Sequence, residues 1–257
     1  MSPKPVVLCL SGHDPGGGAG IQADIEAIAA LGAHAATVIT AHTVQDTRNV
    51  SRVVPADPEL LVQQAEAVLA DLKVAAIKVG LLGDARLPAL IASLARRAGV
   101  PLVLDPVLRA GGGAELSSVA LIEALKTQLM PVTTVLTPNA AEARRLTGLD
   151  ALDDCGKALL FDGCANVLIT GGDEPGDAVV NHWYGVKGTT GLSRAFAWPR
   201  LPGNFHGAGC TLASAIAALL ARGETIEQAL ADAQAYTQRT LKAAFAPGAG
   251  RKIPRRI

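Results

Sequence analysis

The stretch PGNFHGAGCTLASAI at residues 202–216 joins a glycine-rich loop directly to a predicted helix. After Thr211 the apolar residues recur at helical spacing with alanines between them, so we expect the helix to begin where the loop ends. The first amides of a helix have no internal partner, and the helix dipole adds partial positive charge there. Gly207 and Gly209 leave these amides open to an anion, which predicts a cradle for phosphate or for a phosphoryl group in transfer.

Cys210 lies at the point where this loop becomes helix. The field at such a position can lower the pKa of a thiol from about 8.5 to between about 3.5 and 7.5, which makes Cys210 a candidate reactive thiol. A turn that serves only close packing would show the same glycines. The loop by itself therefore leaves both interpretations open.

The composition is that of a globular chain with a large core. Of the 257 residues, 49% are hydrophobic and only 3% are aromatic, so we expect one domain, 1–257, with an aliphatic core. Lys plus Arg equals Asp plus Glu at 23 each, which argues against nucleic acid or an anionic membrane as the main partner. Without a signal-peptide pattern or a long apolar run, we expect a cytoplasmic protein. The basic residues 251–256 predict a solvated, frayed tail.

Short apolar strands alternate with helices along most of the chain. The first strand, residues 6–10, is followed by the glycine-rich loop 11–20 and by a helix at 21–31. The glycine spacing fits neither a dinucleotide-binding fingerprint nor a P-loop. The repeated alternation predicts a parallel sheet covered by helices on both faces. Two β-like runs, 178–184 and 192–198, predict a hairpin at its edge.

Polar residues follow several of the predicted strands, where ligand sites of parallel sheets lie. Asp105, Asn139 and Glu142 carry oxygen ligands suited to Mg²⁺ or to its waters, and Gln45 is a candidate substrate contact. Each has an ordinary alternative, such as a turn at Asp105, a helix cap at Asn139 or a solvated acid at Glu142. Substrate pocket, metal and anion cradle together indicate phosphoryl transfer.

Six motifs follow one another nearly end to end along the chain. They are SGHDPGGGAGIQAD at 11–24, VITAHTVQDTRNV at 38–50, KVGLL at 78–82, DPV at 105–107, TPNAAE at 137–142 and HGAGCT at 206–211. In these motifs the chain closely resembles the hydroxymethylpyrimidine and phosphomethylpyrimidine kinases of thiamine biosynthesis, within the ribokinase-like superfamily. The resemblance implies an α/β fold, a ribokinase-like three-layer α/β/α sandwich with a mostly parallel sheet and an edge β-hairpin. It also implies ATP and Mg²⁺ as cofactors, a small pyrimidine as substrate and a homodimer.

The resemblance implies a role for each matching residue. Cys210 would be the catalytic base that takes the proton from the hydroxymethyl group of the substrate. Gln45 and Asp24 would pair with the amino group and nitrogens of the pyrimidine, and Asp105 and Glu142 would serve Mg²⁺. The other implied site residues are Gly207, Ala208 and Gly209 at the transferring phosphate, Gly12 and Val107 at the pyrimidine, and Asn139, Thr170, Gly171 and Gly172 at the nucleotide.

The chain departs from this family pattern mainly on the phosphate side. Arg109-Ala110-Gly111-Gly112 stands where the family usually has Ala-Lys-Ser-Gly, and Thr170 stands where it has a lysine. We therefore expect Arg109 to be the cation at the triphosphate. Two alternatives stay open, a pyridoxine or pyridoxal kinase on the same scaffold and a non-catalytic small-molecule-binding protein of the same fold.

Overall fold

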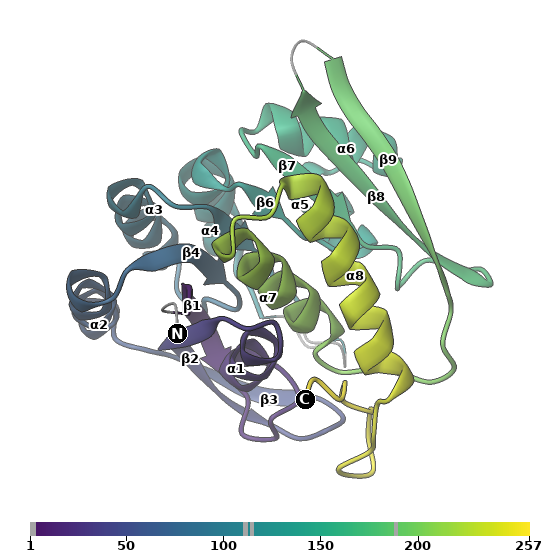
Figure 1. Ribbon diagram of the computed structural model, residues 1–257, viewed down its shortest axis with the longest axis horizontal. Coiled ribbons are helices and arrows are strands. Elements are labelled where there is room, and N and C mark those ends of the chain that lie inside the picture. The colour runs from purple at the N-terminus through teal and green to yellow at the C-terminus, as the bar shows by residue number, and fades with distance from the viewer. Residues whose placement is uncertain (1–3, 110–112, 114–115, 188–189) are drawn as a thin grey trace.

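Figure 1 shows the computed structural model, which describes residues 4–109, 113, 116–187 and 190–257. Within these residues the strands form one nine-stranded sheet in the order β3-β2-β1-β4-β5-β6-β7-β8-β9. The strands from β2 to β7 in this order are parallel, and antiparallel pairs add β3 at one edge and the β8–β9 hairpin at the other. The predicted mostly parallel sheet with an edge hairpin is confirmed. The strands are β1 (Val6–His13), β2 (His34–Gln45), β3 (Val50–Pro55), β4 (Val74–Val79), β5 (Leu102–Leu104), β6 (Val135–Leu136), β7 (Asn166–Ile169), β8 (Ala178–Lys187) and β9 (Thr190–Pro199).

Helices cover both faces of the sheet, which confirms the three-layer sandwich. Val7 and Cys9 of β1 belong to the core that includes α1, α7 and α8, whereas Leu8 and Leu10 belong to the core that includes α2, α3, α5 and α6. Because side chains alternate between the faces of a sheet, an uninterrupted apolar strand needs cover on both sides. The helices are α1 (Gly20–Ala30), α2 (Pro58–Asp71), α3 (Leu87–Ala98), α4 (Val119–Ala124) with the short turns η1 (Leu125–Leu129) and η2 (Met130–Val132), α5 (Ala140–Thr147), α6 (Leu152–Phe161), α7 (Ala208–Ala221) and α8 (Ile226–Lys242).

The C-terminal residues pack on the body of the protein, so the predicted frayed tail is wrong. The backbone of Ile253 bridges to Phe245, and Lys252 bridges to Phe205 in the loop before α7. Arg256 is only 3% exposed, and its carbonyl oxygen accepts a hydrogen bond of 2.9 Å from the hydroxyl of Tyr236 on α8. Figure 1 shows this end of the chain lying beside the loops that follow β1 and β2.

The edge strand β3 is an element that the sequence did not reveal. It pairs with β2, which continues as far as Gln45, and Gln45 itself is paired with Val50. Gln45 therefore belongs to a strand end with a partner, not to a free polar turn. Among the described residues, none of the helices combines the length and the apolarity needed to cross a bilayer.

Candidate active site

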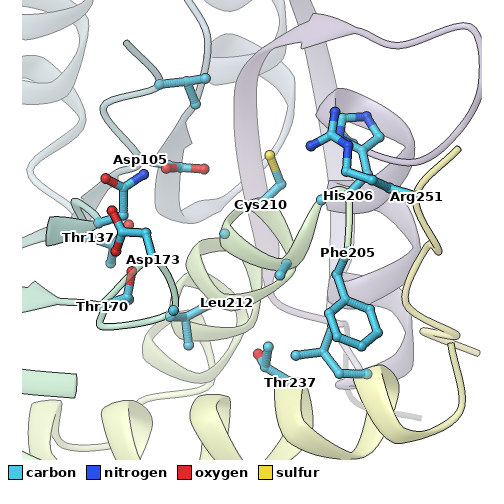
Figure 2. Close-up of a pocket in the computed structure, with 18 of the residues that line it drawn as sticks. Asp105, Thr137, Thr170, Asp173, Phe205, His206, Cys210, Leu212, Thr237 and Arg251 are labelled. Atoms are coloured by element: carbon cyan, nitrogen blue, oxygen red, sulfur yellow. The ribbon is translucent and has the colours of Figure 1, made fainter. Parts of the chain in front are cut away.

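A cavity of about 720 Å³ lies at the carboxyl ends of the parallel strands. This is the place where open α/β sheets bind their ligands. Figure 2 shows Cys210 between two groups of cavity residues. We call them the Asp105 side, with Asp105, Thr137, Thr170 and Asp173, and the Arg251 side, with His206 and Arg251.

The loop before α7 has the shape predicted for an anion cradle. Gly207 is the N-cap of α7 and has a φ of +83°, and a Cβ on it would overlap the carbonyl oxygen of Gly18. Only glycine fits such a position. Gly207, Ala208 and Gly209 all line the cavity, and no side chain of the described residues caps this helix. The start of α7 is thus available to a ligand.

Cys210 lies at the same helix start, partly buried and on the cavity wall. Burial raises the pKa of its thiol to about 12, and the carboxylates of Asp105 and Asp24 add to the rise. The Lys78 ammonium group and the Gly20 amide act in the opposite direction. The predicted lowering of the thiol pKa is wrong for this structure, because removal from water outweighs the helix field.

A buried ion pair joins β4 to α1 next to this wall. The Nζ atom of Lys78 lies 2.8 Å from Oδ1 of Asp24, and both side chains are fully buried. Lys78 also donates to the Ser11 hydroxyl at 2.9 Å, and the Ser214 hydroxyl donates to Asp24 at 2.6 Å. Asp24 is not part of the cavity wall, so its implied contact with the substrate is corrected to an internal role. Lys78 was missed, although a lysine inside an apolar strand is a visible signal.

The remaining implied substrate residues, Gly12, Gln45 and Val107, do line the cavity. Gln45 donates from its side-chain amide to the Thr43 hydroxyl at 2.7 Å, and that hydroxyl donates to the carbonyl oxygen of His13 at 2.8 Å. This chain of hydrogen bonds fixes the direction of the Gln45 amide before any ligand binds. The geometry is compatible with recognition of a ring that carries both an amine and a nitrogen acceptor.

Two buried carboxylates mark the Asp105 side. Glu142 accepts hydrogen bonds from the amides of Leu108 at 3.2 Å and Asn139 at 3.0 Å, while the Asn139 side chain accepts from the Glu142 amide at 2.8 Å. Asn139 is thus a helix cap, as its ordinary alternative predicted, and it also lines the cavity. Burial, with a further contribution from Asp105, raises the pKa of Glu142 to about 8. Burial likewise raises the pKa of Asp105, although Lys78 lowers it in part.

The implied nucleotide residues do not all reach the cavity. Thr170, Gly172 and Arg109 line it. Gly171 does not, because its amide donates to Oδ1 of Asn181 at 3.0 Å and its Cα faces the backbone of the adjacent strand. The departure from the family pattern at 110–112 lies outside the described residues.

Arg256 ties the first glycine loop to the start of α7, a role for which the sequence carries no visible signal. Its side chain is fully buried, and it donates to the Thr211 hydroxyl at 2.8 Å and to Glu26 at 3.0 Å. It also donates to the carbonyl oxygen of Gly18. The Thr211 hydroxyl in turn donates to the carbonyl oxygen of Gly207 at 2.7 Å. One planar guanidinium group thus holds both loops that border the cavity.

We expect Arg256→Lys to lower kcat/KM roughly tenfold to a hundredfold, because a displacement of about 1 Å at a reacting group has effects of that size. A lysine keeps the charge opposite Glu26 but has no planar fork to reach Thr211 and Gly18 together. Steady-state kinetics on both variants checks this, with Arg255→Met as the control, because Arg255 is the exposed neighbour. Equal kinetics for the two variants would contradict the role of Arg256.

Phosphoryl transfer depends mainly on positioning of the reactants and on stabilisation of charge. The residues of this cavity can do both around one helix start. Together with the sheet order and the two helical layers, this cavity defines a kinase of the ribokinase-like class. A family model described as phosphomethylpyrimidine kinase matches residues 14–254. The chain belongs to the phosphomethylpyrimidine kinase family.

Individual relatives and structures agree with this membership. The chain is 38% identical over 259 residues to hydroxymethylpyrimidine/phosphomethylpyrimidine kinase of Streptomyces coelicolor, covering 96% of this chain and 92% of the relative. It is 38% identical over 256 residues to the thiamine biosynthesis bifunctional protein ThiED of Geobacter sulfurreducens, with 96% of this chain but only 51% of that longer protein covered.

Among solved structures, an ADP complex of Bacillus subtilis pyridoxal kinase superposes with a TM-score of 0.89 at 28% identity, covering 98% of this chain and 97% of that one. Phosphomethylpyrimidine kinase from Clostridium difficile gives a TM-score of 0.78 at 31% identity, covering 93% and 100%. The fold is therefore shared by pyridoxal kinase and phosphomethylpyrimidine kinase. The fold alone does not identify the molecule that accepts the phosphoryl group, but the residues of the site bear on it.

Proposed function

We propose that this protein transfers the γ-phosphoryl group of ATP to 4-amino-5-hydroxymethyl-2-methylpyrimidine, and then a second phosphoryl group to the resulting monophosphate, in thiamine biosynthesis. The observation that carries this proposal is the position of Cys210, at the open start of α7, between the Asp105 side and the Arg251 side of a cavity that Gln45 also lines. Gln45 favours a pyrimidine over pyridoxine, because an amide pairs with a ring nitrogen and an exocyclic amine together. The proposal also includes a cytoplasmic location and a homodimer.

In the first transfer the hydroxyl oxygen of the substrate attacks the γ-phosphorus in line with the departing ADP. Cys210 takes the hydroxyl proton, and the amides at 207–210 stabilise charge on the group in transit. Thr170, Gly172 and Asn139 border the space for the nucleotide, and Arg109 is the proposed cation at the triphosphate. In this proposal Arg109, a residue of the cavity wall, takes the role of the lysine in the family pattern.

Mg²⁺ fits the Asp105 side. Burial raises the pKa of both Asp105 and Glu142, and a nearby divalent cation would favour their charged forms. Both oxygens of Glu142 already accept backbone amides, so Glu142 fits a water-mediated contact and Asp105 a closer one. The bound ion would neutralise charge on the phosphates. The described residues hold no group of three or more His, Cys, Asp or Glu side chains arranged for a metal.

The test is a product assay with ATP, Mg²⁺ and the hydroxymethylpyrimidine, in which mono- and diphosphate are separated. A parallel reaction contains pyridoxine or pyridoxal, and a third omits the acceptor. We expect the monophosphate to appear first and the diphosphate after it, with slower turnover of the pyridine substrates. Faster phosphorylation of pyridoxal, which the superposition with pyridoxal kinase makes the natural rival, would move the assignment to that activity. Tight binding without any product would identify a non-catalytic binding protein.

A further inference from the structure

The C-terminal segment places Arg251 in the cavity wall, and the proposed mechanism gives this residue no role. The amide of Arg251 donates to the carbonyl oxygen of Thr47 at 2.9 Å, and the Gly250 amide donates to the Thr47 hydroxyl at 2.9 Å. A Cβ on Gly250 would overlap the backbone of Thr47. The backbone that carries Arg251 is therefore fixed against the loop that follows β2, and the Arg251 side chain lines the cavity.

The guanidinium group of Arg251 is incompletely paired for its degree of burial. Its Nη2 atom donates to the carbonyl oxygen of Arg48 at 3.3 Å, but its buried Nε atom has no hydrogen-bond partner among the described residues. Burial lowers the pKa of Arg251, while Asp14 opposes this change. A buried donor without a partner destabilises the protein, and more so when it is charged. Such a group is satisfied by an anion that enters the cavity.

The nearest carboxylate is already in use. Asp14 accepts hydrogen bonds from the amides of Gly16 at 2.8 Å and Ala19 at 2.9 Å, and its Oδ2 atom lies 3.0 Å from Nε2 of His206. Asp14 therefore shapes the first glycine loop and holds His206. Arg251 forms no ion pair with any residue that the structure describes.

Two other cations of the cavity wall differ from Arg251 in this respect. Lys78 is paired with Asp24 at 2.8 Å. Arg200 donates to backbone carbonyl oxygens within 172–178, at distances from 2.6 to 3.4 Å. Both groups stabilise the protein itself, whereas the Nε atom of Arg251 is left for a ligand.

The position of Arg251 indicates which ligand carries the anion. In Figure 2 Arg251 and His206 lie across Cys210 from Thr170, which borders the proposed nucleotide space. Arg251 is anchored instead to Thr47, two residues after Gln45 of the proposed acceptor pocket. An anion on this side belongs to the acceptor.

We propose that Arg251 binds the phosphate of the phosphorylated acceptor and so determines the second transfer. The inference rests on the proposed function. In that step a phosphate oxygen of the monophosphate forms the new bond to the γ-phosphorus, the bond from the γ-phosphorus to the β–γ bridging oxygen breaks, and ADP leaves. A phosphate monoester with a second pKa of about 6 is ionised at neutral pH, so this step needs no base. It needs a cation that holds two negatively charged groups together, and an arginine fork suits that task.

The test separates the two transfers in the full-length protein. Michaelis constants are measured for the pyrimidine, for its monophosphate and for ATP in Arg251→Met, Arg251→Lys and the exposed control Arg255→Met, together with thermal unfolding midpoints. Arg251→Met should raise KM for the monophosphate about tenfold or more beyond any rise for the unphosphorylated pyrimidine. Arg251→Lys should recover part of this difference. Calorimetric titration of the monophosphate without nucleotide should show the same loss of affinity.

Each outcome discriminates. A rise in KM for ATP with both acceptors would assign Arg251 to the nucleotide and overturn the proposal. An equal rise in KM for the pyrimidine and for its monophosphate would assign it a general structural role, which also overturns the proposal. If Arg251→Met does not fold, the Arg251→Lys variant and the calorimetric titration decide. Wild-type protein that phosphorylates neither pyrimidine overturns the proposed function itself, a result independent of any Arg251 variant.

Discussion

Replacing Cys210 by alanine is expected to lower kcat for the first transfer about 10²–10⁴-fold, which is the contribution usual for a general base. The substitution removes one sulfur atom from a partly buried site, so the free energy of unfolding should change little. Steady-state kinetics and urea denaturation of the same preparations check both statements. Cys164→Ala is the matched control, because Cys164 is buried outside the cavity and should lose stability rather than turnover. A Cys210→Ala variant of near wild-type rate would exclude the base while leaving the anion cradle intact.

The pH dependence of the first transfer should follow the same thiol. Burial raises the pKa of Cys210 to about 12 in this structure, so the thiolate fraction, and with it kcat/KM, should rise with pH through the neutral range. Cys210→Asp replaces the thiol by a carboxyl group at the same position. A carboxylate loses its proton at much lower pH, so the acid limb of the profile should move to lower pH. An unshifted acid limb would show that another group takes the proton.

What the sequence predicted correctly depends on local pattern. A helix at the second glycine loop followed from two glycines and the helical spacing after Thr211, although α7 begins at Ala208. The helix cover on both faces followed from the alternation of strands and helices along the chain. The positions of Gly12, Gln45 and Val107 on the cavity wall agree with the motif resemblance. Each of these features is set by neighbours in the chain or by the order of strands in a parallel sheet.

What the sequence missed depends on contacts between distant positions. Arg256 bonds to Gly18 across 238 positions, and Asp24 pairs with Lys78 across 54. A basic tail that packs on the protein has the same composition as a basic tail that is solvated. Only the folded chain therefore shows that Arg256 is buried. The predicted lowering of the Cys210 thiol pKa was wrong for a related reason. The burial that raises this pKa depends on the whole fold, whereas the helix field depends on local sequence.

Replacing Lys78 by methionine is expected to lower the free energy of unfolding by about 3–5 kcal/mol, the usual cost of removing one partner from a buried ion pair. The reason is the carboxylate left behind. Asp24 is fully buried, and its Oδ2 atom already lacks a hydrogen-bond partner in the described part of the chain. Urea denaturation measures the change. An exposed pair provides the control, since Lys157→Met, which breaks the solvent-screened contact with Asp153, should change the free energy of unfolding little. Similar losses for the two variants would show that burial does not strengthen the Lys78 pair.

A second substitution tells a structural role of Lys78 from an electrostatic one. In Lys78→Met/Asp24→Asn no uncompensated charge remains, and the new amide still accepts from Ser214, so most of the stability should return. Turnover should not return with it. The ammonium group lowers the pKa of both Cys210 and Asp105 by more than the Asp24 carboxylate raises it, so with both charges removed the acid limb of the pH profile should still move to higher pH than in the wild type. A double variant with recovered stability and a wild-type pH profile would show that Lys78 only stabilises the contact between β4 and α1. A displaced profile would mean that this buried pair both holds the sheet to its helix and sets the charge that Cys210 experiences.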